Sequence, residues 1–185
     1  MIFAAGLGTR IKPITDTLPK ALVPVCGKPL IEHVFLKLKS AGVEEAVVNV
    51  HHFAPKIVSW LEEYSASVMQ GQAFSSAMSC EPSSVFSGDR SESRLLPVEI
   101  SDESAMLLET GGAVLHARRF LEGCGRFLIH NVDIFSNVDL VALYENHVKN
   151  GSDASLLVSE RNTSRYFVFD DEDLLVGWKN LQTNE

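Results

Sequence analysis

The first 29 residues, MIFAAGLGTRIKPITDTLPKALVPVCGKP, constrain the fold and function of this chain more than any other stretch. The apolar run Met1–Ala5 predicts a short buried strand, and the loop Gly6–Arg10 follows it directly. Two glycines let the backbone approach a ligand closely, and successive N–H groups in such a loop form a concavity that binds anions. Arg10 and Lys20 add fixed positive charge. Together these features predict a polyphosphate site, against the simpler interpretation of a tight turn between a strand and a helix.

The general glycine motifs for phosphate binding fit this loop poorly. A Rossmann loop needs a third glycine after Gly6 and Gly8, and Ile11 stands at that position. The Walker pattern of a P-loop is absent from the sequence. A dinucleotide-binding oxidoreductase, which predicts NAD(P) binding, is therefore a disfavoured alternative.

A longer pattern is more specific. The segments A-A-G-x-G-T-R-x-x-P-x-T, P-K-A-L-x-P-V and G-K-P-L-I-E follow one another from Ala4 onward. This pattern resembles the sugar-1-phosphate nucleotidyltransferases, the pyrophosphorylases that make nucleotide sugars, and the likeness covers residues 1–64 and 95–185. The resemblance implies the nucleotide-diphospho-sugar transferase fold, a three-layer α/β/α sandwich with a mostly parallel, Rossmann-like sheet.

The alternation of apolar and helical patterns independently favours an α/β fold, because strands separated by helices form parallel sheets covered on both faces. We expect helices at 29–41, from 55 onward, at 111–121 and at 140–149, the last with Asp139 as its N-cap. We expect strands at 1–5, 46–50, 95–100, 126–131 and 154–159, and a hairpin at 165–170 and 174–178 with the acidic run 170–173 as its solvated turn.

Residues 65–94 do not follow this alternation of strand and helix patterns. They are rich in Ser, Gly, Ala and Met and show little periodicity, so we expect a flexible insertion. It is either a tolerated surface loop or, less favoured, a lid or oligomer contact. We interpret residues 1–185 as one nucleotidyltransferase domain. Against the resembled family we expect it to be incomplete at its C-terminus, before a second metal-binding aspartate.

Composition excludes some partners. The net charge of −8 argues against a nucleic-acid surface, and no apolar run is as long as a membrane span. The three cysteines are widely spaced and form no CxxC pair, which suggests a reducing compartment without a structural metal. We therefore expect a cytoplasmic protein, of unknown oligomeric state.

A second candidate site element is Leu108–Gly112, with the sequence L-E-T-G-G. It precedes a predicted helix, which Thr110 could cap, and its glycines could lie flat under a planar base; the alternative is a plain helix start. In the resembled family this segment helps to hold the base and the sugar. The nucleotide-binding residues implied by the resemblance are Ala4, Ala5, Gly6, Gly8, Thr9, Arg10, Glu109, Thr110 and Gly111.

The third element is Asn131–Val132–Asp133, at the end of a predicted strand. Ligands of open α/β sheets gather beyond the carboxyl ends of the strands, and a carboxylate there can hold Mg²⁺. Alone, such an aspartate is more often a loop or cap residue. The resemblance implies that Asp133 binds the catalytic Mg²⁺ and that Arg10, Lys20 and Asp133 carry the catalysis.

Two further stretches bear on the substrate. His51–His52 lacks a third ligand at useful spacing, so we interpret the pair as structural. The V-N-x-H-H and G-W-x-N segments resemble the muramic-acid and mannose branch of the family. There the resemblance implies sugar contacts from Asn131, Trp178, Asn180 and Glu185, with Asn184 a departure from the usual T-G-E.

The hypothesis from the sequence is therefore an enzyme that converts a nucleoside triphosphate and a sugar 1-phosphate to a nucleotide sugar and pyrophosphate. The first choice of substrates is UTP with N-acetylmuramate 1-phosphate, which implies a role in cell wall recycling. The alternatives are GTP with mannose or heptose 1-phosphate, or an inactive regulatory domain that binds a nucleotide sugar.

Overall fold

The computed structural model describes residues 1–69, 96–160 and 162–183. The chain divides into two compact units, Met1–Val141 and Ala142–Glu185, which we call unit 1 and unit 2. The interpretation of residues 1–185 as one domain stays a prediction.

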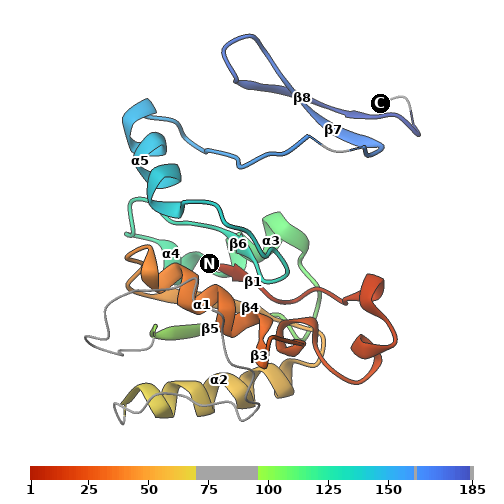
Figure 1. Ribbon diagram of the computed structural model, residues 1–185, viewed down its shortest axis with the longest axis vertical. Coiled ribbons are helices and arrows are strands. Elements are labelled where there is room, and N and C mark those ends of the chain that lie inside the picture. Colours follow the sequence, from red (N-terminus) through yellow and green to blue (C-terminus); the bar gives the residue numbers. More distant parts are fainter. Residues whose placement is uncertain (70–95, 161, 184–185) are drawn as a thin grey trace. The chain divides into compact units, whose positions relative to one another are not determined.

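A parallel sheet forms the centre of unit 1 (Figure 1). Its strands are β1 (Ile2–Phe3), β4 (Ala46–Val50), β5 (Val98–Asp102) and β6 (His130–Asn131), in the order β5-β4-β1-β6. Ile2 lies opposite Val48 on one side and His130 on the other. All neighbouring pairs are parallel, so the carboxyl ends of the strands meet at one edge of the sheet.

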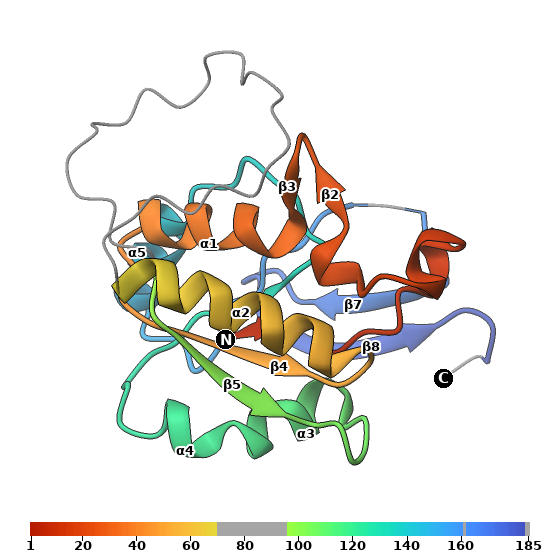
Figure 2. The same ribbon diagram turned by 90° about the horizontal axis from the view of Figure 1, so that it is seen from below.

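Helices cover both faces of this sheet (Figure 2). On one face lie α1 (Leu30–Ser40) and α2 (Ala54–Met69), where the ring of Phe35 packs against Tyr64 with centroids 4.9 Å apart. On the other face lie α3 (Glu109–His116) and α4 (Arg118–Leu121), where Ala113 and Ala117 pack with Val47 in a buried cluster. The expected three-layer α/β/α arrangement is confirmed.

The segment between β1 and α1 contains short turns of helix and one hairpin. The 3₁₀ turns are η1 (Thr9–Ile11), η2 (Ile14–Asp16) and η3 (Lys20–Leu22), and the hairpin pairs β2 (Pro24–Val25) with β3 (Lys28–Pro29). Cys26 and Gly27 both have positive φ, 48° and 79°, as a two-residue hairpin turn requires. The sequence analysis did not predict this hairpin.

Unit 2 contains most of α5 (Leu140–Asn150) and a hairpin of β7 (Arg165–Phe169) and β8 (Leu175–Asn180). The Val141 N–H donates to Asp139 Oδ1 at 2.9 Å, which confirms Asp139 as the cap. The predicted β-hairpin is also confirmed. Asp170 Oδ1 accepts the N–H groups of Glu172 and Leu174 across its exposed turn.

Several predicted elements differ from the structure. The predicted strand 1–5 is paired only at Ile2–Phe3, and the predicted strand 95–100 is shifted to Val98–Asp102. Residues 154–159 form no strand and are exposed, because a strand needs a partner and β7 and β8 pair with each other. The predicted strand 126–131 is paired only at its last two residues. The predicted helix 111–121 begins earlier, at Glu109, and breaks at Ala117 between α3 and α4.

The first residues of the predicted insertion are helical. Residues 65–69 continue α2, and the rest of the predicted segment, 70–94, lies outside the described residues. A search for membrane spans among the described residues found no helix with the length and apolar character required.

Candidate active site

The loop of residues 4–10, which we call the phosphate loop, leaves the carboxyl end of β1. Gly8 has a φ of 65°, a conformation that glycine adopts readily. Its carbonyl accepts the Thr15 hydroxyl at 2.7 Å and the Ile11 N–H at 3.1 Å. Thr15 is only 2% exposed, so a buried hydroxyl fixes the turn of the loop.

The two glycines of the loop have different surroundings. A Cβ added to Gly8 would lie 2.7 Å from Thr15 Cγ2, so Gly8 is required for packing. A Cβ added to Gly6 would meet nothing within 4 Å. The exposed Gly6 backbone therefore faces open space.

Lys20 and Asp133 come together in unit 1. The Lys20 ammonium group forms an ion pair with Asp133 Oδ2. Lys20 lies in η3, and Asp133 follows β6; their side chains are 20% and 38% exposed. Arg10, in η1, is exposed. The structure thus brings together two of the three predicted catalytic residues in a partly dehydrated place.

The segment after β6 is held on two sides. The Val132 N–H donates to the Phe3 carbonyl at 3.1 Å, which ties the segment to β1. Lys37, on α1, donates to the Ser136 carbonyl at 2.8 Å and to its hydroxyl at 2.9 Å. These contacts limit where the Asp133 carboxylate can lie, and neither Lys37 nor Ser136 was singled out from the sequence.

His130 is the buried first residue of β6, three positions before Asp133. Its Nδ1 lies 2.8 Å from the Asn131 carbonyl, and its exposed fraction is 8%. Burial lowers the pKa of this imidazole below its usual value of 6.5. The neutral ring is therefore favoured beside the carboxyl end of the sheet.

The segment Leu108–Gly112, which we call the base segment, forms the start of α3. Glu109 has a φ of 57° and is the first helical residue. Thr110 lies inside the first turn and does not cap the helix, so that prediction was wrong: the helix begins at Glu109, two residues before the predicted start at Gly111. A Cβ on Gly111 would meet nothing within 4 Å, which leaves its exposed backbone accessible to a planar group.

A buried hydrogen-bonded chain links the phosphate loop to the strand and loop that precede the base segment. The Ala4 N–H donates to Asn49 Oδ1 at 2.8 Å, and Asn49 Nδ2 donates to Glu103 Oε1 at 2.9 Å. Each of the two side chains is 3% exposed. We call these contacts the Asn49–Glu103 bridge. Asn49 lies in the V-N-x-H-H segment, but no sequence signal identified Glu103.

Both residues of the histidine pair have contacts in unit 1. His51 Nδ1 donates to the Glu103 carbonyl at 2.8 Å, and the His52 ring packs on Phe53 with centroids 4.2 Å apart. Among the described residues, His, Cys, Asp and Glu form no group of three that could hold a metal.

The residues predicted to contact the sugar are distributed over both units. Asn131 is an exposed residue of β6 in unit 1. In unit 2, Trp178 is exposed and pairs with Phe167 across the hairpin. Asn180 is buried, and its Oδ1 accepts the Gln182 N–H at 3.0 Å. Glu185 lies outside the described residues.

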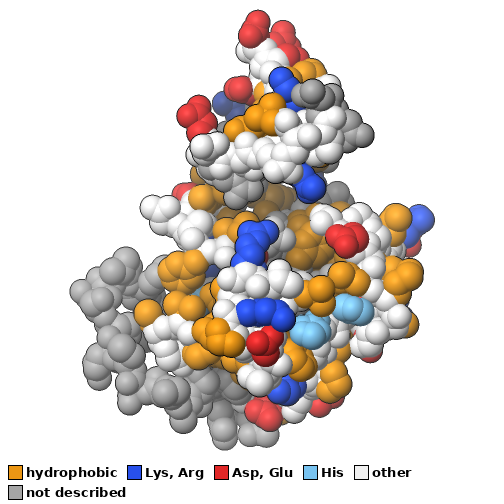
Figure 3. All heavy atoms as spheres, turned by 90° about the vertical axis from the view of Figure 1, so that its right-hand side faces the viewer, with side chains coloured by type: hydrophobic (Ala, Val, Ile, Leu, Met, Phe, Trp, Pro, Cys, Tyr) orange, Lys and Arg blue, Asp and Glu red, His pale blue; other side chains and the backbone are white. Residues whose placement is uncertain are grey.

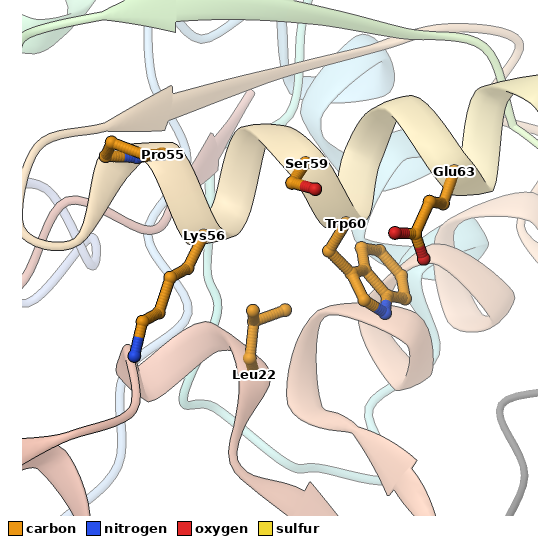
Figure 4. A pocket seen from close by; sticks show the side chains of 6 residues that line it. All are labelled: Leu22, Pro55, Lys56, Ser59, Trp60 and Glu63. Carbon is orange, nitrogen blue, oxygen red and sulfur yellow. The ribbon is translucent and has the colours of Figure 1, made fainter.

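Figure 3 shows the face of unit 1 on the side of the phosphate loop, where Lys and Arg side chains lie beside acidic and imidazole side chains. A separate surface hollow of about 420 Å³ lies between η3 and α2 (Figure 4). Leu22 and Trp60 face each other across it, and Lys56, Ser59 and Glu63 line the helix side. None of these residues is a predicted site residue.

The sequence of the chain is similar to those of known proteins. A family profile described as Nucleotidyl transferase matches residues 1–172. The N-acetylmuramate alpha-1-phosphate uridylyltransferase of Caulobacter vibrioides is 38% identical over 133 residues, which cover 72% of this chain and 44% of that protein. Mannose-1-phosphate guanylyltransferase 1 of Arabidopsis thaliana is 26% identical over 161 residues, covering 86% and 37% respectively. The chain thus spans about half or less of the length of these curated relatives.

The solved structures show the same fold. HddC from Yersinia pseudotuberculosis, in a crystal structure complexed with GMP-PN, superposes with a TM-score of 0.62 at 20% identity. The match covers 97% of this chain and 67% of that one. At this identity the likeness establishes the fold alone.

Proposed function

The chain belongs to the nucleotidyl transferase family, and from this we propose that the protein transfers a nucleotidyl group from a nucleoside triphosphate to a sugar 1-phosphate. The observation that carries the proposal is the Lys20–Asp133 ion pair at the carboxyl edge of the sheet. A cation and a carboxylate held together there are complementary to phosphates and to a phosphate-bound metal.

The proposed reaction is an in-line displacement. An oxygen of the sugar 1-phosphate attacks the α-phosphorus, the bond from that phosphorus to the bridging oxygen breaks, and pyrophosphate leaves. Such a transfer depends on positioning and charge neutralisation rather than on covalent catalysis. The products are the nucleotide sugar and pyrophosphate, so atoms and charge balance without a further reactant.

The residues of the phosphate loop hold the triphosphate in this proposal. Gly6, Gly8 and Thr9 offer backbone N–H groups, and the exposed Arg10 neutralises the leaving pyrophosphate. Lys20 leaves its ion pair with Asp133 when the phosphates bind, and its ammonium group then lies against the α-phosphate and the attacking phosphate. Preorganised cations in a partly dehydrated site stabilise the charge that develops in the transition state.

In this proposal Asp133 is a ligand of Mg²⁺, together with oxygen atoms of the substrate. Mg²⁺ commonly takes one or two carboxylates and completes its shell with water and phosphate oxygens. The Asp133 side chain is partly exposed, so water and phosphate oxygens can reach its carboxylate. Among the described residues it belongs to no group of three candidate metal ligands. When bound, the ion would neutralise charge on phosphate oxygens. Ala4, Ala5 and the exposed groups of Glu109, Thr110 and Gly111 are proposed to bind the nucleotide.

For the substrates we propose UTP with N-acetylmuramate 1-phosphate, supported by the greater identity to the uridylyltransferase named above. This choice places the protein in cell wall recycling, with Asn131, Trp178, Asn180 and Glu185 toward the sugar. The second candidate is GTP with mannose or heptose 1-phosphate. The three widely spaced cysteines, without a CxxC pair, support the proposal of a reducing, cytoplasmic environment.

The test measures pyrophosphate release by the full-length protein with four nucleoside triphosphates and several sugar 1-phosphates. We expect release with one preferred pair, and UTP as the preferred nucleotide. A preference for GTP would overturn the substrate choice and leave the reaction type intact. Tight binding of a nucleotide sugar in calorimetry, without turnover of any pair, would instead identify a regulatory domain.

A further inference from the structure

The proposed chemistry does not use the Asn49–Glu103 bridge. We infer that Asn49 and Glu103 are positioning residues, whose hydrogen bonds fix the start of the phosphate loop relative to the chain that leads into the base segment, in the arrangement that binds a nucleoside triphosphate. The inference rests on the proposed function.

The Asn49–Glu103 bridge lies where the chain leaves the sheet after β1. Phe3 is the last residue of β1, and Asn49 lies opposite it in β4. The next backbone N–H, that of the buried Ala4, donates to Asn49 Oδ1 at 2.8 Å. A buried N–H without an acceptor is costly. The Asn49 carbonyl oxygen therefore determines the direction in which the chain enters the phosphate loop.

Glu103 determines the orientation of the Asn49 amide. Its Oε1 accepts from Asn49 Nδ2 at 2.9 Å, which leaves Asn49 Oδ1 directed toward Ala4. The backbone of Glu103 is itself fixed, because its N–H donates to the Val50 carbonyl at 2.8 Å. Its carbonyl accepts from His51 Nδ1 at 2.8 Å and from the Met106 N–H at 3.1 Å. The same residue thus holds Asn49 and begins the turn toward Leu108.

Packing alone does not explain a glutamate at this position. Among the described residues, Glu103 Oε2 is buried and has no hydrogen-bond partner. A buried carboxylate oxygen without a partner destabilises a fold. The acceptor at Oε1 gives a reason for the residue, because it orients the amide that holds the phosphate loop.

The arrangement allows a test by reciprocal exchange of donor and acceptor. Asn49→Asp places a second carboxylate oxygen against Glu103 Oε1, so the bridge breaks. In the double variant with Glu103→Gln, the Gln amide donates to the new carboxylate, whose other oxygen still accepts from Ala4. Glu103→Gln alone keeps an acceptor for Asn49 and is the conservative control. A double-mutant cycle of this kind isolates the pairwise contact.

The measurements are triphosphate affinity by calorimetry, KM and kcat for turnover, and hydrogen exchange at the Ala4 amide, all in the full-length protein. Asn49→Asp should lower kcat/KM by a factor on the order of 10², the loss of rate that a misplacement of about 1 Å produces, and should weaken triphosphate binding. The Ala4 amide should exchange faster while the amides of Val48 and Val50 keep their protection. In the double variant, the triphosphate affinity and the exchange rate of the Ala4 amide should both return to within about tenfold of wild type.

The possible results separate the bridge from the proposed reaction. If the wild-type protein binds a triphosphate but turns over no substrate pair, the proposed enzyme activity is overturned. The inference about Asn49 and Glu103 is then tested by the binding and exchange data alone. Unchanged triphosphate affinity in Asn49→Asp, or a double variant no better than Asn49→Asp, would overturn the inference. Failure of the wild type to bind any of the four triphosphates would overturn both proposals.

Discussion

The ammonium group of Lys20 forms an ion pair with the carboxylate of Asp133, 113 positions later in the chain. The pair joins η3, which follows the phosphate loop, to the end of β6. Both side chains retain contact with solvent, and exposed ion pairs contribute only about 0–1 kcal/mol to folding. The contact therefore matters for the arrangement of charge at the sheet edge more than for stability.

Lys20→Ala should reduce turnover strongly and barely change the melting temperature. Removing one preorganised charge contact to a transition state lowers kcat by a factor on the order of 10²–10³. Lys149→Ala, at an exposed position in the last turn of α5, is the control and should behave like wild type. Steady-state kinetics and thermal unfolding check both variants. Turnover near the wild-type level in Lys20→Ala would show that the reacting phosphates lie elsewhere.

Asp133→Asn should raise the Mg²⁺ concentration needed for half-maximal turnover. The neutral amide is a weaker ligand for a hard cation than the carboxylate, so metal titration of the rate measures the effect. Asp153→Asn removes an exposed carboxylate in unit 2 and serves as the matched control. If the two variants have the same Mg²⁺ dependence, Asp133 does not hold the metal.

The two glycines of the phosphate loop should respond differently to alanine. Gly8→Ala places a methyl group 2.7 Å from Thr15 in a left-handed conformation, and that conformation alone costs roughly 1–2 kcal/mol. Its free energy of unfolding should fall. Gly6→Ala meets nothing within 4 Å and should keep wild-type stability while weakening triphosphate binding. Denaturant unfolding measures the stability of both variants, and calorimetry measures their triphosphate binding. A destabilised Gly6→Ala beside a Gly8→Ala of wild-type stability would contradict the assignment of Gly6 to the side that faces the ligand.

The stability of unit 1 should depend on the protonation of His130. Burial lowers its pKa in the folded state, so below about pH 6.5 the unfolded chain binds the proton more readily. The stability that the neutral ring contributes is complete above that pH and is lost as the pH falls through the lowered pKa. His130→Asn should therefore lose less unfolding free energy than wild type between about pH 7.5 and about pH 5.5.

Urea unfolding at the two pH values checks this prediction. His147→Asn, at a half-buried position on α5 where His147 Nδ1 lies 3.0 Å from Ser155 Oγ, is the control and should follow the wild-type pH dependence. Equal losses in wild type and His130→Asn would mean that the buried imidazole does not control stability in this range.

Much of the sheet could be predicted because its strands and helices have clear periodic patterns. The strand Ala46–Val50 is buried along its whole length and has the predicted bounds. Residues 154–159 look equally apolar but form no strand, since strand formation depends on a partner that sequence pattern does not identify. The β2–β3 hairpin was missed although Gly27 could have indicated a turn.

The candidate site was predictable only where a motif carried it. Lys20 and Asp133 were identified separately, and the structure supplies their contact. Asn49, Glu103 and Lys37 act through hydrogen bonds between segments that are distant in the sequence. Such bonds leave no periodic or spacing signal, because each depends on the tertiary position of both partners.

The most direct test of the proposed nucleotidyl transfer is the stoichiometry of pyrophosphate and nucleotide sugar formed by the full-length protein from UTP and N-acetylmuramate 1-phosphate. We predict equal amounts of the two products, dependence on both substrates and a rate in Lys20→Ala that is lower on the order of 10²–10³. Absence of pyrophosphate with every triphosphate and sugar 1-phosphate, or pyrophosphate release that does not need the sugar phosphate, would contradict it.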